Sequence, residues 1–161
     1  MGTRSGDVDP GLAEFLCNRL DISLADVMSV LNKESGLLGL SGVSNDMRAV
    51  QQAAGEGNQR AHLALEVFAF RIARYLGALA VSLPRIDALI FTGGIGENDR
   101  VTRSRVIEHL AILGFALDDD LNQQNGDEIG RISKSGSTLA LVIPTNEELM
   151  IARDTALLTS L

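Results

Sequence analysis

Two short stretches of the 161-residue chain combine residue types that suit phosphate chemistry. Residues 92–98 form a glycine turn directly after an apolar run, and its candidate residues for an anion site are Gly94, Ile95, Gly96, Glu97 and Asn98. Glycines let a backbone approach a ligand closely, and free N–H groups at a helix start attract negative charge. A tight strand-to-helix turn without a ligand fits the same residues, because a lone glycine run is a weak signal.

Arg4 is the candidate cation for such a site. It stands between Gly2 and Gly6, in a loop rich in glycine and aspartate that ends at Pro10. An arginine whose backbone can be placed tightly can clamp an oxyanion through two parallel hydrogen bonds. A solvated loop arginine is the ordinary alternative.

Further candidates follow at two predicted helix starts. Asp46, Met47 and Arg48 lie in the first turn of one predicted helix, where Arg48 is either a surface residue or a platform for a flat base. Glu147 and Glu148 follow the second apolar run, where a helix dipole stabilises acids. A carboxylate at the end of a parallel strand could instead hold Mg²⁺ on a nucleotide.

The remaining reactive residue types favour structural roles. Cys17 on a predicted helix is more often a small buried hydrophobe than a nucleophile, and His62 and His109 have no acid or cysteine at ligand spacing. The acidic run at residues 118–120 resembles a metal site, but a helix cap or a loop facing water is the commoner arrangement.

Alternating elements of an α/β domain must position these candidates. Residues 88–91 and 139–143 predict strands buried on both faces, whereas residues 115–117 and 131–133 predict strands only weakly. We expect helices from Pro10 to about residue 20, over 24–33, 46–54, 58–83, from Glu97 to near residue 114, and over 149–158. Ser23 and Asp26 form a capping box, Ser44 or Asn45 caps the third helix, Thr145 or Asn146 caps the last, and residues 36–42 are an apolar loop.

The long helix over residues 58–83 is apolar on almost every side, which predicts burial all round. Few strands are available to cover it. We therefore expect the chain to expose apolar surface, and to need a partner or to be a piece of a larger protein.

Composition excludes several classes of function. The formal net charge of −7 argues against a nucleic-acid-binding face, and 45% hydrophobic residues indicate a globular domain. A single cysteine excludes an internal disulfide framework and fits a cytoplasmic location. No apolar stretch has the length and flanks of a signal peptide or a membrane span, so we expect no membrane partner.

Four motifs in order carry a family resemblance: residues 1–10, 41–48, 91–98 and 143–148. Together they closely resemble the C-terminal part of the acetate kinase family, which includes propionate and butyrate kinases, and the resemblance extends over the whole chain. It implies the duplicated ribonuclease-H-like fold shared by actin, sugar kinases and Hsp70. It also implies reversible phosphoryl transfer between ATP and acetate, giving acetyl phosphate and ADP, with Mg²⁺ as cofactor and a homodimeric assembly.

The same resemblance implies roles for individual residues. Arg4 matches the catalytic arginine that stabilises the transferring phosphoryl group, and residues 46–48 match the segment around the adenosine. Residues 94–98 match the glycine loop at the nucleotide. Glu147 matches the acidic residue assigned to the metal.

Members of this family are much longer than 161 residues. The part without a counterpart here carries the first domain, the opening three strands of the second, the catalytic aspartate and histidine, and the substrate-binding arginine. We therefore expect residues 1–161 to be a C-terminal fragment of the second domain. Residues 1–57 would form an active-site loop with inserted helices, and residues 58–161 the long helix with its strand units. Alone, the chain should bind nucleotide weakly at best and not turn over.

Two other classes of function fit parts of the sequence. A dinucleotide-dependent oxidoreductase would need an acid about twenty residues after the glycine turn, at the end of a second strand. The acids at 118–120 have that spacing, but the strand before them is very short. A non-catalytic module that dimerises through its apolar faces is the other alternative.

Overall fold

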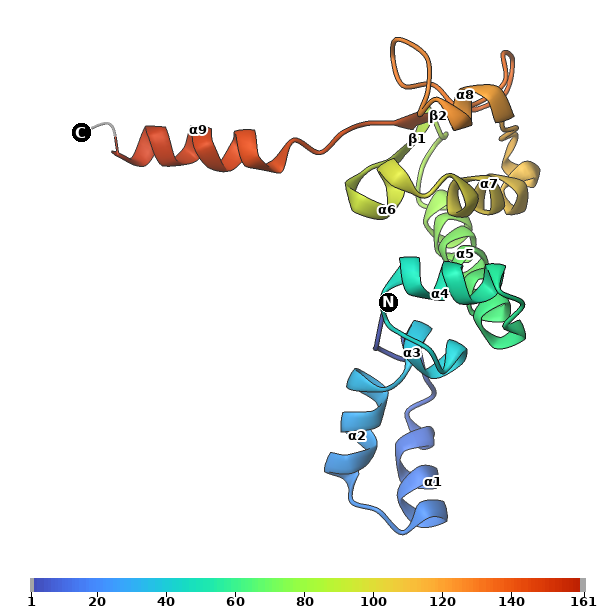
Figure 1. Cartoon of the computed structure of the whole chain (residues 1–161), viewed down its shortest axis with the longest axis vertical. Helices are drawn as coiled ribbons and strands as arrows, with labels where there is room; N and C mark the ends of the chain where they lie inside the picture. The colour runs from blue at the N-terminus through green and yellow to red at the C-terminus, as the bar shows by residue number, and fades with distance from the viewer. Residues whose placement is uncertain (1, 160–161) are drawn as a thin grey trace. The chain divides into compact units, whose positions relative to one another are not determined.

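The computed structural model describes residues 2–159 (Figure 1), which form two compact units divided between Arg71 and Ile72. The first unit contains α1 (Gly11–Leu20), α2 (Leu24–Lys33), α3 (Gly36–Ser41), α4 (Met47–Gly55) and the first half of α5 (Gln59–Ala80). The second unit continues with the end of α5 and then β1 (Ala88–Phe91), α6 (Gly93–Asn98), α7 (Arg100–His109), a 3₁₀ turn (Ala111–Leu113), α8 (Asp119–Gln123), β2 (Leu139–Val142) and α9 (Glu147–Thr159).

The first helices begin where the sequence predicts. Asp9 accepts a hydrogen bond from the Gly11 amide at 2.7 Å, next to Pro10 at the start of α1. Ser23 and Asp26 form the predicted capping box of α2, in which each side chain accepts from the other residue's backbone N–H. Both starts depend only on residues close in sequence, so local chemistry was sufficient to predict them.

The predicted loop at residues 36–42 is wrong, because these residues form α3. Leu37 is buried, and Arg60 on α5 donates to the C-terminal carbonyl groups of Gly39 and Leu40 at 2.8 and 3.0 Å. Gly42 then ends the helix with a φ of 68°. Packing and a cation at the helix C-terminus outweigh the low helix propensity of the glycines.

Asp46, rather than Ser44 or Asn45, is the N-cap of α4, since its side chain accepts from the Arg48 amide. The helix places Met47 in the hydrophobic core of the first unit. The other buried members of this core come from α3, α4 and α5, and they are Leu37, Val50, Ala61, Ala64 and Leu65. The segment 46–48 is therefore fixed by a cap on one side and by core packing on the other.

A two-stranded parallel sheet organises the second unit. β1 and β2 pair in register from Ala88 opposite Leu139 to Phe91 opposite Val142. The weakly predicted strands contribute isolated bridges instead, such as Arg131 opposite Leu141. Parallel pairing brings the C-terminal ends of both strands to one edge, as the sequence predicts.

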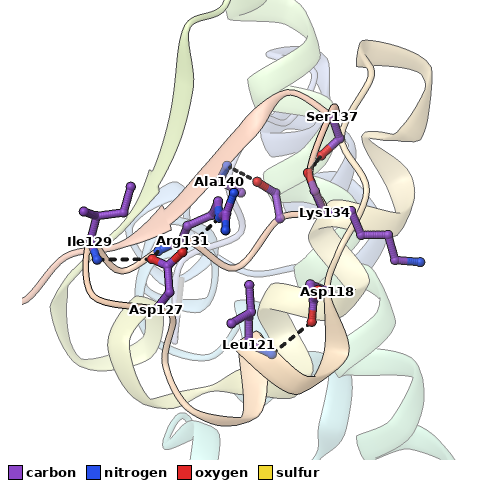
Figure 2. A network of polar contacts seen from close by, with 9 residues as sticks. Asp118, Leu121, Asp127, Ile129, Arg131, Lys134, Ser137 and Ala140 are labelled. Atoms are coloured by element: carbon purple, nitrogen blue, oxygen red, sulfur yellow. Dashed lines mark hydrogen bonds and ion pairs between the residues drawn. The ribbon is translucent and has the colours of Figure 1, made fainter.

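A polar segment, residues 127–133, lies beside β2 (Figure 2). The Asp127 carboxylate accepts hydrogen bonds from the amides of Ile129 and Arg131 at 3.1 and 3.0 Å, and Ser133 Oγ accepts from the Ala140 amide at 3.0 Å. The amide of Arg131, donating to the Asp127 carboxylate, is the main cause of the lowered pKa of that carboxyl group. The hydrogen bonds of this segment join residues that are mostly a few positions apart.

The strands are less buried than predicted. Phe91, Ala140 and Val142 are buried, but Ile90 is 52% exposed. Buried and half-buried residues alternate along β2, so one face is better covered than the other. A strand buried on both faces needs a packed layer on each side, and the described residues do not supply both.

Helix α5 also departs from the prediction of burial all round. Its buried positions are mainly small residues, whereas its exposed large side chains include Leu63, Phe70, Tyr75 and Leu79. The expectation of exposed apolar surface is confirmed. No helix among the described residues is long and apolar enough to cross a lipid bilayer.

The predicted helix from Glu97 to about residue 114 is divided differently. The glycine turn is itself helical, as α6, and α7 begins only at Arg100 with Asp99 as its N-cap. Asp118, in the acidic run, caps α8 by accepting from the Leu121 amide, so the helix-cap alternative is confirmed. The last helix begins at Glu147, two residues earlier than predicted.

Candidate functional site

The carboxyl ends of β1 and β2 are joined by a threonine pair and a glycine amide. Thr92 Oγ1 and Thr145 Oγ1 lie 2.6 Å apart, and the Gly93 amide donates to Thr145 Oγ1 at 2.8 Å. The Thr145 hydroxyl donates its own proton to Glu97, so Thr92 is the donor within the threonine pair. The Thr145 hydroxyl therefore binds Glu97 and Gly93 at the strand edge. It does not cap α9, although Thr145 is one of the two predicted caps.

Glu97 completes this edge from α6. One carboxylate oxygen, Oε1, accepts from the Thr145 amide, the Thr145 hydroxyl and the Gly93 amide, each at 2.9 Å. These hydrogen bonds, first that of the Thr145 amide, lower the pKa of Glu97. The side chain is therefore ionised at neutral pH, and it binds protein donors from both strand ends.

Three glycines of the turn differ in what a side chain would meet at their positions. A Cβ on Gly96 would lie 3.0 Å from the carbonyl carbon of Phe91, so only glycine lets α6 approach β1 this closely. Gly93 has a φ of 70°, which favours glycine. Gly94 is exposed, and a Cβ there would meet open space, so this position can accept a neighbour that the chain itself does not supply.

The other predicted residues of the turn lie at its surface. Asn98 donates its side-chain amide to the Gly94 carbonyl at 3.0 Å, within α6 itself. Ile95 is 41% exposed. Both stay candidates for nucleotide contact, although the Asn98 amide already has an acceptor in the turn.

Arg103 is a supporting residue that the sequence analysis missed. Its side chain is fully buried, and its NH1 group donates to the carbonyl groups of Gly96 and Glu97 at 2.8 and 2.9 Å. The rest of the guanidinium binds Asn122 and Asn125. Burial, together with the charge of Arg100, lowers the pKa of Arg103.

A signal for Arg103 was present in the sequence. Val106 and Ile107 lie three and four positions later and are both buried, so Arg103 shares their helix face. An arginine on an apolar stripe needs acceptors, and here the carbonyl groups at the C-terminal end of α6 provide them. The buried guanidinium of Arg103 thus holds the C-terminal end of the glycine turn through two carbonyl groups.

Glu147 begins α9 two residues after Thr145, and its side chain is exposed. Among the described residues, no group of three or more histidine, cysteine, aspartate or glutamate side chains is arranged to hold a metal ion. Mg²⁺ commonly uses one or two carboxylates and completes its shell with waters and substrate phosphates. The oxygen donors of Glu147 therefore fit the magnesium assignment, and a dedicated protein cage is not required.

In the first unit, Arg4 lines a hollow of about 440 Å³. The other residues around it come from the same loop and from α1 and α2, namely Ser5, Gly6, Val8, Asp9, Pro10, Ala13, Met28, Leu31 and Asn32. The loop backbone is anchored on both sides of Arg4, since Ser5 donates to Leu31 and Thr3 accepts from Ser35, each at 2.8 Å. Arg4 itself is exposed, and no ion pair is seen for it among the described residues.

The Asp46 carboxylate and the Arg48 guanidinium form an exposed pair. Arg48 donates from its amide and from NH2 to the two carboxylate oxygens, each at 2.8 Å, and this lowers the pKa of Asp46 to about 2. Met47 is buried in the core, so its side chain faces away from solvent. Gly2 lies against Asn45, where a Cβ would be 3.1 Å from the Asn45 carbonyl oxygen.

The predicted site residues therefore form two groups. The loop of Arg4 and the segment 46–48 are neighbours in the first unit. The glycine turn and the segment that leads to Glu147 meet at one sheet edge in the second unit.

Residues 1–153 match the family profile described as the Acetokinase family. The chain belongs to this family. It is 51% identical over 160 residues to an acetate kinase of Deinococcus radiodurans and 54% identical over 156 residues to one of Ectopseudomonas mendocina. These alignments cover 98% and 96% of the chain but only 40% of each relative.

Solved structures give the same assignment. A propionate kinase from Francisella tularensis superposes with a TM-score of 0.87 at 44% identity, and an acetate kinase from Porphyromonas gingivalis with 0.86 at 43%. The chain covers 39% and 40% of these proteins. Its helix-rich architecture with a small parallel sheet is thus a partial α/β domain of the acetokinase family.

Proposed function

We propose that this chain supplies part of the active site of an acetate kinase, which transfers a phosphoryl group reversibly between ATP and acetate to give acetyl phosphate and ADP. The observation that supports this most is the sheet edge, where the glycine turn and the segment before Glu147 meet. Ligands of α/β proteins bind at the carboxyl ends of parallel strands. Family membership supports the choice of reaction.

Each residue group has a role that its chemistry suits. Phosphoryl transfer spreads negative charge over the transferred group, so catalysis depends on positioning and on positive charge. The exposed guanidinium of Arg4 would stabilise that charge. Residues 46–48 would flank the adenosine, and the turn at residues 94–98 would bind the nucleotide through its backbone.

Glu147 would hold Mg²⁺ through its carboxylate. When bound, the metal would neutralise charge on the nucleotide phosphates. None of these candidate residues is assigned as a covalent nucleophile, and the proposed reaction needs none.

The chain spans about 40% of the length of its curated relatives. We propose that, on its own, it binds ADP or ATP weakly at best and does not turn over. A coupled assay with the isolated chain, acetate, ATP and Mg²⁺ tests this. Sustained acetyl phosphate formation would contradict the second half of the proposal.

A chimera tests the role of the chain in catalysis. Residues 1–161 would replace the matching part of the Deinococcus radiodurans acetate kinase, to which they are 51% identical. We expect acetyl phosphate formation from the chimera, and its loss by about a hundredfold or more when Arg4→Ala removes the charge on the transferred group. The Arg85→Ala chimera is the control, because Arg85 is exposed and pairs only with the nearby Asp87 among the described ion pairs.

The carboxylate substrate of the proposed kinase can be acetate, propionate or butyrate. A propionate kinase is among the similar structures, so propionate or butyrate is an alternative substrate. Comparing kcat/KM of the chimera for acetate, propionate and butyrate decides among them. Protection of the chain against heat by NAD but not by ADP would instead favour an oxidoreductase.

We also propose a homodimeric assembly and a cytoplasmic location. Exposed apolar side chains on α5 support the first, and the single cysteine supports the second. A chain that contributes only a dimer interface would be insensitive to loss of Arg4.

A further inference from the structure

The carboxylate of Glu97 is the point where three separate backbone segments meet. Its Oε1 atom accepts from Gly93, which follows β1, and from both the amide and the hydroxyl of Thr145, which follows β2. Glu97 itself belongs to α6. All three distances are 2.9 Å, within the range of good charge-assisted hydrogen bonds.

We propose that Glu97 is a positioning residue that ties the segment after β2 to the glycine turn, and so fixes the place from which Glu147 acts. This inference rests on the proposed function, because it assigns Glu147 to the metal. Only Asn146 separates Thr145 from Glu147, so a displacement of Thr145 is passed on to the start of α9.

The surroundings of Glu97 make this tie stiff. Its own carbonyl group accepts from the buried Arg103 at 2.9 Å, so both its backbone and its side chain are held. The side chain is half-buried. The hydroxyl groups of Thr92 and Thr145, 2.6 Å apart, form a second link between the ends of β1 and β2.

A direct contact between Glu97 and a nucleotide phosphate is disfavoured by charge. The carboxylate is ionised at neutral pH, and neither it nor a phosphate oxygen has a proton to donate to the other. The sequence resemblance placed Glu97 with the nucleotide-binding residues. Its hydrogen bonds assign it instead to the support of the turn and of the metal-side segment.

Two substitutions separate positioning from a need for charge. Glu97→Gln keeps a carbonyl oxygen that can accept the same three bonds, whereas Glu97→Ala removes the acceptor. Amide hydrogen exchange of the chain, followed by NMR, should show faster exchange of the Thr145 amide in Glu97→Ala, whereas the Gly93 amide keeps Thr145 Oγ1 as a second acceptor. Glu97→Gln should exchange within about threefold of the unmodified chain, since it preserves the hydrogen bonds. Glu128→Ala is the matched control, an exposed carboxylate in another turn of the same unit.

The functional consequence is measured as the gain in ADP affinity that Mg²⁺ produces. We expect Glu97→Ala to reduce this gain by about tenfold, as is typical when the support of a metal ligand is lost, and Glu97→Gln to retain most of it. Affinity for ADP without Mg²⁺ is measured in parallel, so that the ratio of the two affinities reports on the metal side alone. A merely destabilised fold would lower both affinities together.

Three outcomes would overturn the inference: unchanged exchange in Glu97→Ala, equal loss of the magnesium gain in Glu97→Gln and Glu97→Ala, or equal loss in the Glu128→Ala control. If the unmodified chain binds too little ADP to measure, the same affinities are measured on the chimera with the Deinococcus radiodurans acetate kinase, and absence of ADP binding there contradicts the proposed function. The hydrogen-exchange comparison then decides separately whether Glu97 ties the two strand ends.

Discussion

Arg103 and Asp46 show how surroundings decide what a charged residue contributes. Arg103 has no exposed surface, yet its Nε, NH1 and NH2 groups all donate to protein acceptors. Asp46 is exposed and acts locally, as the cap of α4 and the partner of Arg48. The first residue is coupled to several segments of the second unit, whereas the second acts on a single helix end.

Replacement of Arg103 by methionine should lower the free energy of unfolding by about 3 kcal/mol or more, because it leaves buried carbonyl groups without donors. Urea denaturation of the chain measures this change. Arg100→Met is the matched control on the same helix, at an exposed position, and should cost less than about 0.5 kcal/mol. Equal losses in the two variants would show that the buried hydrogen bonds contribute little.

The pKa of Asp46 gives a prediction for acid stability. A folded-state pKa of about 2 lies below the ordinary value of 3.8, so ionised Asp46 contributes stability above pH 4 that is lost as pH falls toward 2. Arg48→Gln removes the guanidinium and should raise this pKa toward 3.8. A ¹³C NMR titration of the Asp46 carboxyl group checks the shift, and an unchanged pKa in Arg48→Gln would contradict the assigned cause.

At the scale of elements, the short helix α6 connects the sheet to the candidate site. Its N-terminal residues follow β1, its middle packs against Phe91 through Gly96, and its C-terminal carbonyl groups are bound by Arg103. α6 has only six residues, so it cannot be stable by itself. Its geometry therefore comes from β1, β2 and α7 around it.

Two glycines of α6 should respond differently to alanine. Gly96→Ala places a Cβ 3.0 Å from the Phe91 carbonyl carbon and should destabilise the chain by about 1–3 kcal/mol through overpacking. Gly94→Ala meets open space and should change stability by less than about 0.5 kcal/mol. Thermal unfolding and urea titration of both variants measure this difference.

The Gly94→Ala variant also tests whether this glycine contacts the nucleotide. If the backbone at Gly94 contacts ADP, Gly94→Ala should weaken ADP binding without loss of stability, because a methyl group separates backbone and ligand. Unchanged ADP affinity in Gly94→Ala would remove this residue from the proposed site.

At the scale of the whole chain, the main feature is apolar surface without cover. Val81 is 86% exposed and Leu79 63%, at the end of α5 and just after it, and all described residues of α9 are exposed. Patches of this kind on a folded protein usually mark contacts with another chain or domain. They agree with a chain that covers only part of its relatives.

We expect self-association of the chain in solution as a consequence. Sedimentation velocity at increasing concentration should show species larger than the 17.2 kDa monomer. The double variant Leu79→Ser, Val81→Ser should shift the distribution toward monomer, since it removes apolar area from one patch. The control Lys134→Ser changes an exposed charged residue and should leave the distribution unchanged. A monomer at every concentration would contradict the prediction.

Much of the local structure follows from neighbouring residues. The capping box at Ser23 and Asp26, the apolar runs of β1 and β2, and the four family motifs can all be read from short stretches of chain. Such features depend on contacts within a few positions, for which the sequence is sufficient. The candidate residues of the glycine turn and Glu147 were found in this way.

Tertiary structure alone decided the rest. Residues 36–41 became a helix because Leu37 is buried and Arg60, about twenty positions away, binds the helix end. Arg103 became a support of the glycine turn because Asn122 and Asn125 complete its hydrogen bonds from another element. Glu97 found its partner at Thr145, 48 positions later, through the parallel pairing of two strands. The types of the reactive residues are therefore sequence information, whereas their partners depend on which distant segments the fold brings within hydrogen-bonding distance.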